Sequence, residues 1–162
     1  MLIYLRHGDD RGNDVYQHDR HLTDRARAKA SKQAMRLIDK HGHPDAVYVS
    51  PFRRALDTLE AMAERFDREV TIHHDPRIAQ YLSEKQQRDP KVSPETRAQI
   101  TLDEDRDAFK RRVAEHFEDV RRQADSRIWC ITHQSVIEEI ANNLGVRISA
   151  RLDYLDHVVM LD

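Results

Sequence analysis

The sequence has little of what marks disulfide-bonded, zinc-binding or membrane-spanning proteins. Cys130 is the one cysteine among 162 residues, which excludes an internal disulfide framework and a cysteine-based zinc site. No apolar run approaches the ~20 residues that span a bilayer. The apolar start, Met1–Arg6, is too short for a secretory signal and lacks a basic beginning. We therefore expect a cytoplasmic protein with no membrane association.

The sequence also lacks an excess of either charge. Its 27 basic and 29 acidic side chains give a net charge of -2, which argues against bulk electrostatic binding to nucleic acid or to a membrane surface. The arginines at 111, 112, 121 and 122 are predicted to form the solvated face of a helix. No repeat and no linker interrupts the chain, so residues 1–162 are expected to form one domain.

Short, nearly continuous apolar runs alternate with stretches of helical periodicity. The runs predict strands buried on both faces, at Leu2–Leu5, Ala46–Val49, Val70–Ile72, Ile128–Thr132 and Val158–Leu161. Helical stripes run from Ala26 to Ile38, Ala55 to Phe66, Phe109 to Val120 and Val136 to Leu144; Thr23 is the expected first N-cap, and Gly42 and Gly145 supply helix ends. The alternation predicts a three-layer α/β/α domain with a largely parallel central sheet. The polar segment from about 77 to 103 is expected to be an irregular, lid-like excursion.

Arginines and histidines follow three of the predicted strands. Arg6 and His7 follow the first strand, Arg54 belongs to a block after the second, and His133 follows the fourth. Ligands of open α/β sheets bind beyond the carboxyl ends of the strands, so these side chains are expected to converge. Together they suit a phosphate ester, because arginines offer planar forks of donors to anionic oxygens and a neutral imidazole could attack phosphorus.

The sequence resembles the histidine phosphatase superfamily, which has the phosphoglycerate-mutase-like fold. The similar motifs occur in the same order and at matching spacing over nearly the whole chain: Leu5–Gly8, Leu22–Ala26, Ser50–Thr58 and Thr132–His133. The resemblance implies that His7 is the nucleophile that becomes phosphohistidine and that His133 is the second pocket histidine. It also implies that Arg6 and Arg54 clamp the phosphoryl oxygens.

Physical chemistry agrees with those implied roles. Phosphoryl transfer depends mainly on positioning and charge stabilisation, so the guanidiniums can neutralise the phosphate without a metal or another cofactor. The arginines are also expected to lower the pKa of His7 and keep its ring neutral. Asn13 stands where mutase-type members carry a phosphate-contacting asparagine, although a turn beside Gly12 explains an asparagine there equally well.

One position departs from the family pattern. The family places a proton-donating glutamate a few residues after the third strand, and the aligned residue here is Gln80, which cannot donate a proton in that way. General-acid help is typically worth ~10²–10⁴-fold. Three alternatives remain open: Glu84 reaches in, Asp9 or Asp10 does so, or the leaving group needs no acid because it is a phosphohistidine, an acyl phosphate or a phosphoanhydride.

Two functions therefore stay open. The first is a metal-independent phosphatase that acts on a small phosphorylated metabolite or on a phosphohistidine protein. The short chain and its Arg-His-Gly-Asp start are similar to short bacterial phosphohistidine phosphatases, whereas the stretch from Asp105 to Val113 is similar to mutase and sugar-phosphatase members. The second is a catalytically impaired phospho-ligand-binding module of the same fold, which Gln80 motivates. The oligomeric state stays open. The histidine pairs at 41/43 and 73/74 are not expected to bind a metal, because no third metal ligand follows at a typical spacing.

Overall fold

A computed structural model describes residues 1–10, 20–83, 94, 104–123, 125–148 and 151–161. Five strands form one sheet in the order β3-β2-β4-β1-β5. The neighbours β1 (Leu2–Arg6), β4 (Ile128–Thr132), β2 (Ala46–Val49) and β3 (Thr71–His74) are parallel, and β5 (His157–Leu161) runs antiparallel to β1. The largely parallel sheet predicted from the sequence is confirmed.

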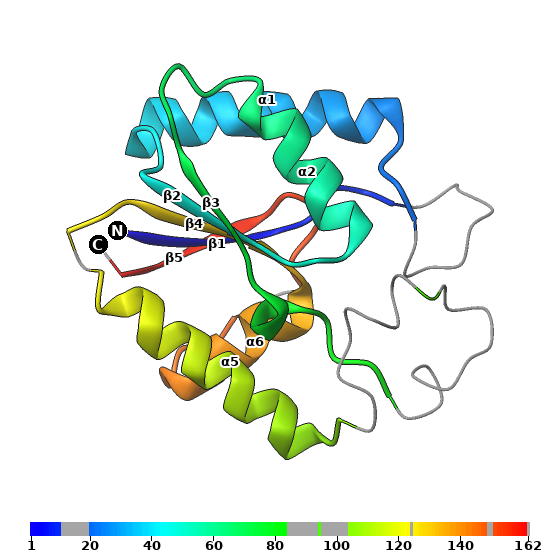
Figure 1. Cartoon of the computed structure of the whole chain (residues 1–162), viewed down its shortest axis with the longest axis vertical. Helices are drawn as coiled ribbons and strands as arrows, with labels where there is room; N and C mark the ends of the chain where they lie inside the picture. Colours follow the sequence, from blue (N-terminus) through cyan, green and yellow to red (C-terminus); the bar gives the residue numbers. More distant parts are fainter. Residues whose placement is uncertain (11–19, 84–93, 95–103, 124, 149–150, 162) are drawn as a thin grey trace.

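Helices cover both faces of this sheet. Figure 1 shows α1 (Asp24–His41) and α2 (Arg53–Ala63) on one face, and α5 (Arg106–Arg121) and α6 (Gln134–Asn143) on the other. A short 3₁₀ helix, η1 (Pro76–Ile78), follows β3. The described residues thus form the predicted α/β/α layers, and none of the described helices has the length and apolarity to cross a membrane.

The central strands divide their side chains between two cores. On β1, Leu2 and Tyr4 pack toward α5 and α6, whereas Ile3 and Leu5 pack toward α1 and α2. This alternation follows from the period of two in a strand. Because β1, β2 and β4 have helices on both sides, all their residues are buried, which is why they read as continuous apolar runs.

Three expectations about element bounds or exposure were wrong. The third strand is shifted to Thr71–His74 and is mostly exposed, because it is the edge strand beside β2 in the sheet of described residues. Phe66 lies beyond α2, although its side chain still packs against the core. Arg112 does not belong to a solvated face: its side chain is 14% exposed and ion-paired with Glu104.

The helices differ in whether a side chain caps their first turn, and this difference points to a candidate anion site. Thr23 caps α1 and Asp105 caps α5, each accepting a backbone N–H with its side-chain oxygen. By contrast, Phe52 before α2 and His133 before α6 make no such bond. The two helices without a side-chain cap are those that begin directly after β2 and β4, at the carboxyl edge of the sheet. Their first N–H groups and partial positive charge favour an anion there.

Candidate active site

His7 follows β1 at the carboxyl edge, and its ring has a defined tautomer. The backbone N–H of His7 donates to the Thr132 carbonyl at 3.0 Å, which extends the β1–β4 pairing by one residue. Nδ1 lies 2.7 Å from the carbonyl oxygen of Gly8. Because a carbonyl only accepts, Nδ1 carries the hydrogen and Nε2 keeps its lone pair. Arg54 Nε donates to that lone pair at 3.1 Å.

The surroundings of His7 keep its ring neutral. The side chain is buried, and the pKa of His7 lies well below its usual range, first because burial disfavours the charged ring and then because Arg54 and Arg6 repel a second positive charge. The bond to Gly8 and the charge of Asp9 oppose this shift. The expected lowering by arginines is present, but burial contributes more. A neutral imidazole with a lone pair on Nε2 is the nucleophilic form.

Arg54 joins the two histidines from the first turn of α2. Its Nη2 lies 3.3 Å from His133 Nδ1 and donates to Gln80 Oε1 at 2.5 Å. A guanidinium only donates, so Nδ1 of His133 accepts and its Nε2–H donates to Ser50 Oγ at 2.7 Å. The centroids of the His7 and His133 rings are 5.1 Å apart. Burial lowers the pKa of Arg54 to about 10, so its guanidinium stays charged at neutral pH.

Arg6 is the last residue of β1, and its charge acts on His7. Its Nη1 donates to the Leu152 carbonyl at 2.5 Å, and its guanidinium carbon lies 4.2 Å from the centroid of the Tyr154 ring. Its Nε is buried and has no hydrogen-bond partner among the described residues. An unsatisfied buried donor is costly, so an anion that accepts from Nε would stabilise the site. Of the four predicted side chains, His7, Arg54 and His133 contact one another, and Arg6 lies near enough for its charge to act on His7.

The motif residues around these four hold the strand end and the helix in place. Gly8 N–H donates to Thr58 Oγ1 at 2.9 Å, and the same hydroxyl donates to the Arg54 carbonyl at 2.7 Å. A Cβ at Gly8 would lie 3.0 Å from a methyl carbon of Leu22. Asp57, fully buried, accepts from the Leu22 N–H at 2.9 Å. These contacts explain why the first three motifs occur together, a role that their spacing alone did not reveal.

The other predicted site residues, the phosphate-ligand candidate Asn13, the candidate proton donors and Gln80, are placed unequally. Asn13 and Glu84 lie outside the described residues. Asp10 is buried, and its Oδ2 lies 3.8 Å from Arg54 Nε. Asp9 is half-buried, and its charge affects His7. Gln80 does reach the site, through its bond to Arg54.

Two residues at the site were not predicted. Tyr154 lies between the last helix and β5, with its ring centroid 5.7 Å from that of His7 and its hydroxyl 3.4 Å from Asp10 Oδ1. The hydroxyl of Ser135, in the first turn of α6, is buried without a hydrogen-bond partner among the described residues. Ser135 stands two residues after His133, which was a usable signal. Tyr154 offered none, because no strand or helix pattern of the sequence places it near His7.

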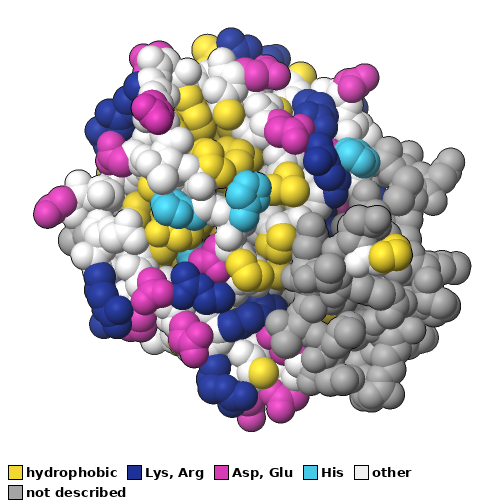
Figure 2. Space-filling model, viewed as in Figure 1, with side chains coloured by type: hydrophobic (Ala, Val, Ile, Leu, Met, Phe, Trp, Pro, Cys, Tyr) yellow, Lys and Arg dark blue, Asp and Glu magenta, His cyan; other side chains and the backbone are white. Residues whose placement is uncertain are grey.

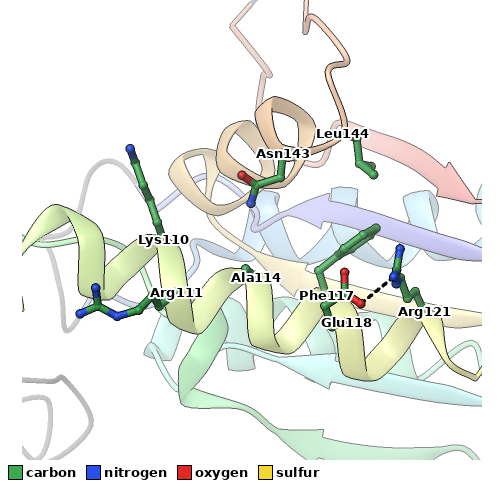
Figure 3. A pocket seen from close by; sticks show the side chains of 8 residues that line it. All are labelled: Lys110, Arg111, Ala114, Phe117, Glu118, Arg121, Asn143 and Leu144. Atoms are coloured by element: carbon green, nitrogen blue, oxygen red, sulfur yellow. Dashed lines mark ion pairs between the residues drawn. The ribbon is translucent and has the colours of Figure 1, made fainter.

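A hollow between α5 and α6 lies apart from these residues. Figure 3 shows its lining, which includes Lys110, Arg111 and Phe117 of α5 and Asn143 and Leu144 at the end of α6. None of the predicted site residues that the structure describes lines it. Basic and acidic side chains are mixed over the described part of the face in Figure 2. The described residues contain no group of three or more His, Cys, Asp or Glu suited to a metal ion.

Comparison with solved structures shows the same fold in several phosphatases. Mycobacterial glucosyl-3-phosphoglycerate phosphatase matches with a TM-score of 0.66 and 21% identity, covering 96% of this chain and 87% of that one. Phosphoserine phosphatase from Entamoeba histolytica matches with a TM-score of 0.61 and 20% identity, covering 96% and 87%. The protein histidine phosphatase SixA, complexed with tungstate, matches with a TM-score of 0.64 and 16% identity, covering 94% and 81%. A search of curated proteins found no match.

These identities establish the fold and nothing finer, but a family model gives more. The model of the histidine phosphatase superfamily (branch 1) matches residues 2–155, which span every motif and all four side chains of the pocket. The resemblance seen in the sequence and the predicted fold are both confirmed. The chain belongs to the histidine phosphatase superfamily, branch 1.

Proposed function

We propose that the protein is a metal-independent phosphatase that hydrolyses phosphomonoesters or phosphohistidine through a covalent phosphohistidine on His7. Membership of the superfamily implies phosphatase chemistry of this kind on phosphorylated substrates. The observation that carries the proposal is the lone pair on Nε2 of the buried His7 ring, which accepts from Arg54 Nε at 3.1 Å.

In the first step, His7 Nε2 forms a bond to phosphorus while the bond from phosphorus to the leaving group breaks. The Arg54 Nε–H must leave Nε2 for this to happen, and it then has a phosphoryl oxygen to donate to. Arg6 Nε, the buried donor without a partner among the described residues, supplies a second contact. In the second step, water attacks phosphorus, inorganic phosphate leaves, and His7 returns to its neutral form.

His133 and the start of α6 complete this anion site. In the free protein, Nδ1 of His133 accepts from Arg54 and its Nε2–H donates to Ser50 Oγ. His133 can therefore donate to a phosphoryl oxygen from Nδ1 only when its ring is protonated or its tautomer changes. The first N–H groups of α6 and the Ser135 hydroxyl lie directly after it. These donors stabilise charge that grows on the phosphoryl oxygens in the transition state.

The surroundings of Gln80 favour substrates whose leaving group needs no proton. A neutral amide at 2.5 Å orients the Arg54 guanidinium without neutralising its charge. A glutamate there would pair with Arg54 and compete with the phosphate. This arrangement suits phosphohistidine, acyl phosphates and phosphoanhydrides. For an alkyl phosphate, the candidate proton donors among the described residues are Asp10, whose Oδ2 lies 3.8 Å from Arg54 Nε, and Asp9, whose charge acts on His7.

A second candidate function is a phospho-ligand-binding module without turnover. Gln80 favours it, because the pocket keeps its cationic donors while the family's acid is absent. Both functions need the same anion site, and they differ only in whether the phosphoryl group is transferred to His7.

A leaving-group series separates the two. The protein is incubated with an activated aryl phosphate, a phosphoramidate and an alkyl phosphate, and both released phosphate and acid-labile protein-bound phosphate are measured. The phosphatase releases phosphate from the first two and passes through an acid-labile phosphoenzyme. Tight binding of inorganic phosphate or a phosphopeptide, with no release from any of the three, would instead establish the binding module.

A further inference from the structure

The chain returns to the site in a turn just before β5. This C-terminal turn, residues 151–156, is bonded to the end of β1: the N–H of Arg6 donates to the Asp156 carbonyl at 2.9 Å, and the N–H of Leu155 donates to the Arg6 carbonyl at 3.1 Å. The Asp153 N–H donates to Asp156 Oδ2 at 2.6 Å within the turn. The turn is therefore fixed against the strand that ends in the anion site.

Leu155 shows how firmly the turn is held. It is the one described residue other than glycine with a positive φ, at 66°. Such a conformation is unfavourable for a leucine and persists only where the surroundings impose it. Here its side chain is 8% exposed and belongs to the core cluster that contains Ile3 and Leu5. The neighbouring residue, Tyr154, consequently has a determined position over the site.

Tyr154 contacts Arg6 through its ring and Asp10 through its hydroxyl. The guanidinium carbon of Arg6 lies 4.2 Å from the ring centroid, within the range of cation–π attraction. The Tyr154 hydroxyl lies 3.4 Å from Asp10 Oδ1, while the other oxygen of Asp10 faces Arg54 Nε at 3.8 Å. One side chain thus touches both an arginine and a carboxylate of the site.

We propose that Tyr154 is a positioning residue that fixes the Arg6 guanidinium for the phosphoryl group. This inference rests on the proposed function in taking Arg6 as a phosphate ligand. A long arginine side chain loses much conformational freedom when it binds, so a site that orders it in advance binds more tightly. The Tyr154 ring and the Leu152 carbonyl together restrain the guanidinium, and they leave its buried Nε as the donor for the anion.

Two substitutions separate the ring from the hydroxyl, and binding of inorganic phosphate is the first readout because it needs no turnover. Tyr154→Leu removes the aromatic face and should weaken phosphate binding about tenfold, within the range of a desolvated cation–π contact. Tyr154→Phe keeps that face and should bind phosphate within about twofold of the unsubstituted protein. Phe66→Leu, which trims another half-buried aromatic ring packed against Trp129, is the matched control and should leave phosphate binding unchanged.

Kinetics with an activated aryl phosphate give the second readout. Tyr154→Leu should raise KM by about the same factor as the phosphate dissociation constant, with a smaller change in kcat. In an Arg6→Ala background, adding Tyr154→Leu should cost nothing further, because the ring acts through that guanidinium. Unchanged phosphate affinity in Tyr154→Leu, or an equal loss with and without Arg6, would overturn the inference. Phosphate binding without turnover would refute the phosphatase while leaving the test of Tyr154 intact.

Discussion

His7 and His116 are both almost fully buried, yet their surroundings differ. His116, on α5, has Nδ1 2.9 Å from Asp75 Oδ2 and Nε2 3.7 Å from Cys130 Sγ, so both ring nitrogens have protein partners. Burial lowers the pKa of His116 and Asp75 opposes the shift. His7 has no carboxylate hydrogen-bonded to its ring in the described part of the chain, and the partner of its Nε2 is the cationic Arg54.

The difference separates a histidine that stabilises the fold, His116, from one whose ring is available for reaction, His7. Burial alone would raise the pKa of Asp75, but hydrogen bonds from His116 and Arg77 hold it well below its usual range. In that cluster the negative charge of Asp75 is compensated by the hydrogen bonds from Arg77 and His116, and these bonds join η1 to α5. Around His7, by contrast, Arg54 contacts the ring directly and Arg6 adds positive charge, while the described carboxylates, Asp9 and Asp10, make no hydrogen bond to the ring, so the pocket can accept an added anion.

Removing the His7 ring tests whether this histidine is the nucleophile, and it has the largest expected effect on turnover. His7→Ala should lower kcat on an activated aryl phosphate by about 10⁴–10⁶-fold, because no nucleophile remains. The acid-labile phosphate should disappear with it, while circular dichroism remains that of the folded protein. Activity within a factor of about ten of the unsubstituted protein would remove His7 from the mechanism.

Removing the guanidinium beside it has the next largest effect. Arg54→Ala should lower kcat/KM by about 10²–10³-fold, or roughly 3–4 kcal/mol of transition-state stabilisation. Arg53→Ala is the matched control one residue away, because Arg53 is ion-paired with Asp57 and Glu60 outside the pocket. Near-normal kinetics in Arg54→Ala would contradict the site assignment.

Gln80→Glu sharpens the comparison by adding a carboxyl group to the cationic pocket. It should raise activity on an alkyl phosphate relative to an aryl phosphate by about tenfold or more, since only the alkoxide needs a proton. Activity on the aryl phosphate should fall, because the new carboxylate lies within reach of Arg54 Nη2 and competes with the substrate. Equal changes for both substrates, measured as kcat/KM, would show that residue 80 does not face the leaving group.

Removing the other histidine should affect stability rather than turnover. His116→Leu deprives Asp75 of one partner but leaves it Arg77, so we expect a loss of about 1–3 kcal/mol in the free energy of unfolding, measured in urea. The kcat of the folded protein at 25 °C should stay within about twofold of the original. A loss of turnover comparable to that of His7→Ala would abolish the distinction between the two histidines.

The pH dependence of stability gives the smallest effect. The pKa of folded His116 is lowered from 6.5, so below that pH the unfolded chain binds a proton that the folded chain does not. The free energy of unfolding should therefore fall as the pH drops below 6.5, by at most ~1.4 kcal/mol per pH unit for this group. His116→Leu should show a shallower slope between pH 7 and about 5 than the unsubstituted protein. Equal slopes would mean that His116 does not resist protonation.

The sequence predicted the parts of the protein that repeat a simple pattern. Buried strands and helix stripes follow from local periodicity, and the Thr23 cap follows from residue preference at helix starts. The rule that ligands bind beyond the carboxyl ends of parallel strands predicted that residues 6, 7, 54 and 133 lie at one edge of the sheet. Prediction from the sequence failed where a contact joins distant segments that no periodic pattern or motif links. Arg112 was misplaced because its partners, Glu104 and the carbonyls of Arg77 and Ala79, lie off its helix. Tyr154 was missed for the same reason.

A crystal structure of the protein with vanadate tests the central claim most directly, since vanadate mimics the phosphorus of the transition state. We predict a bond from vanadium to Nε2 of His7, with its oxygens accepting from Arg6, Arg54 and the start of α6. Vanadate bound to Nδ1, or seated in the hollow between α5 and α6 with the histidine pocket unchanged, would contradict the account.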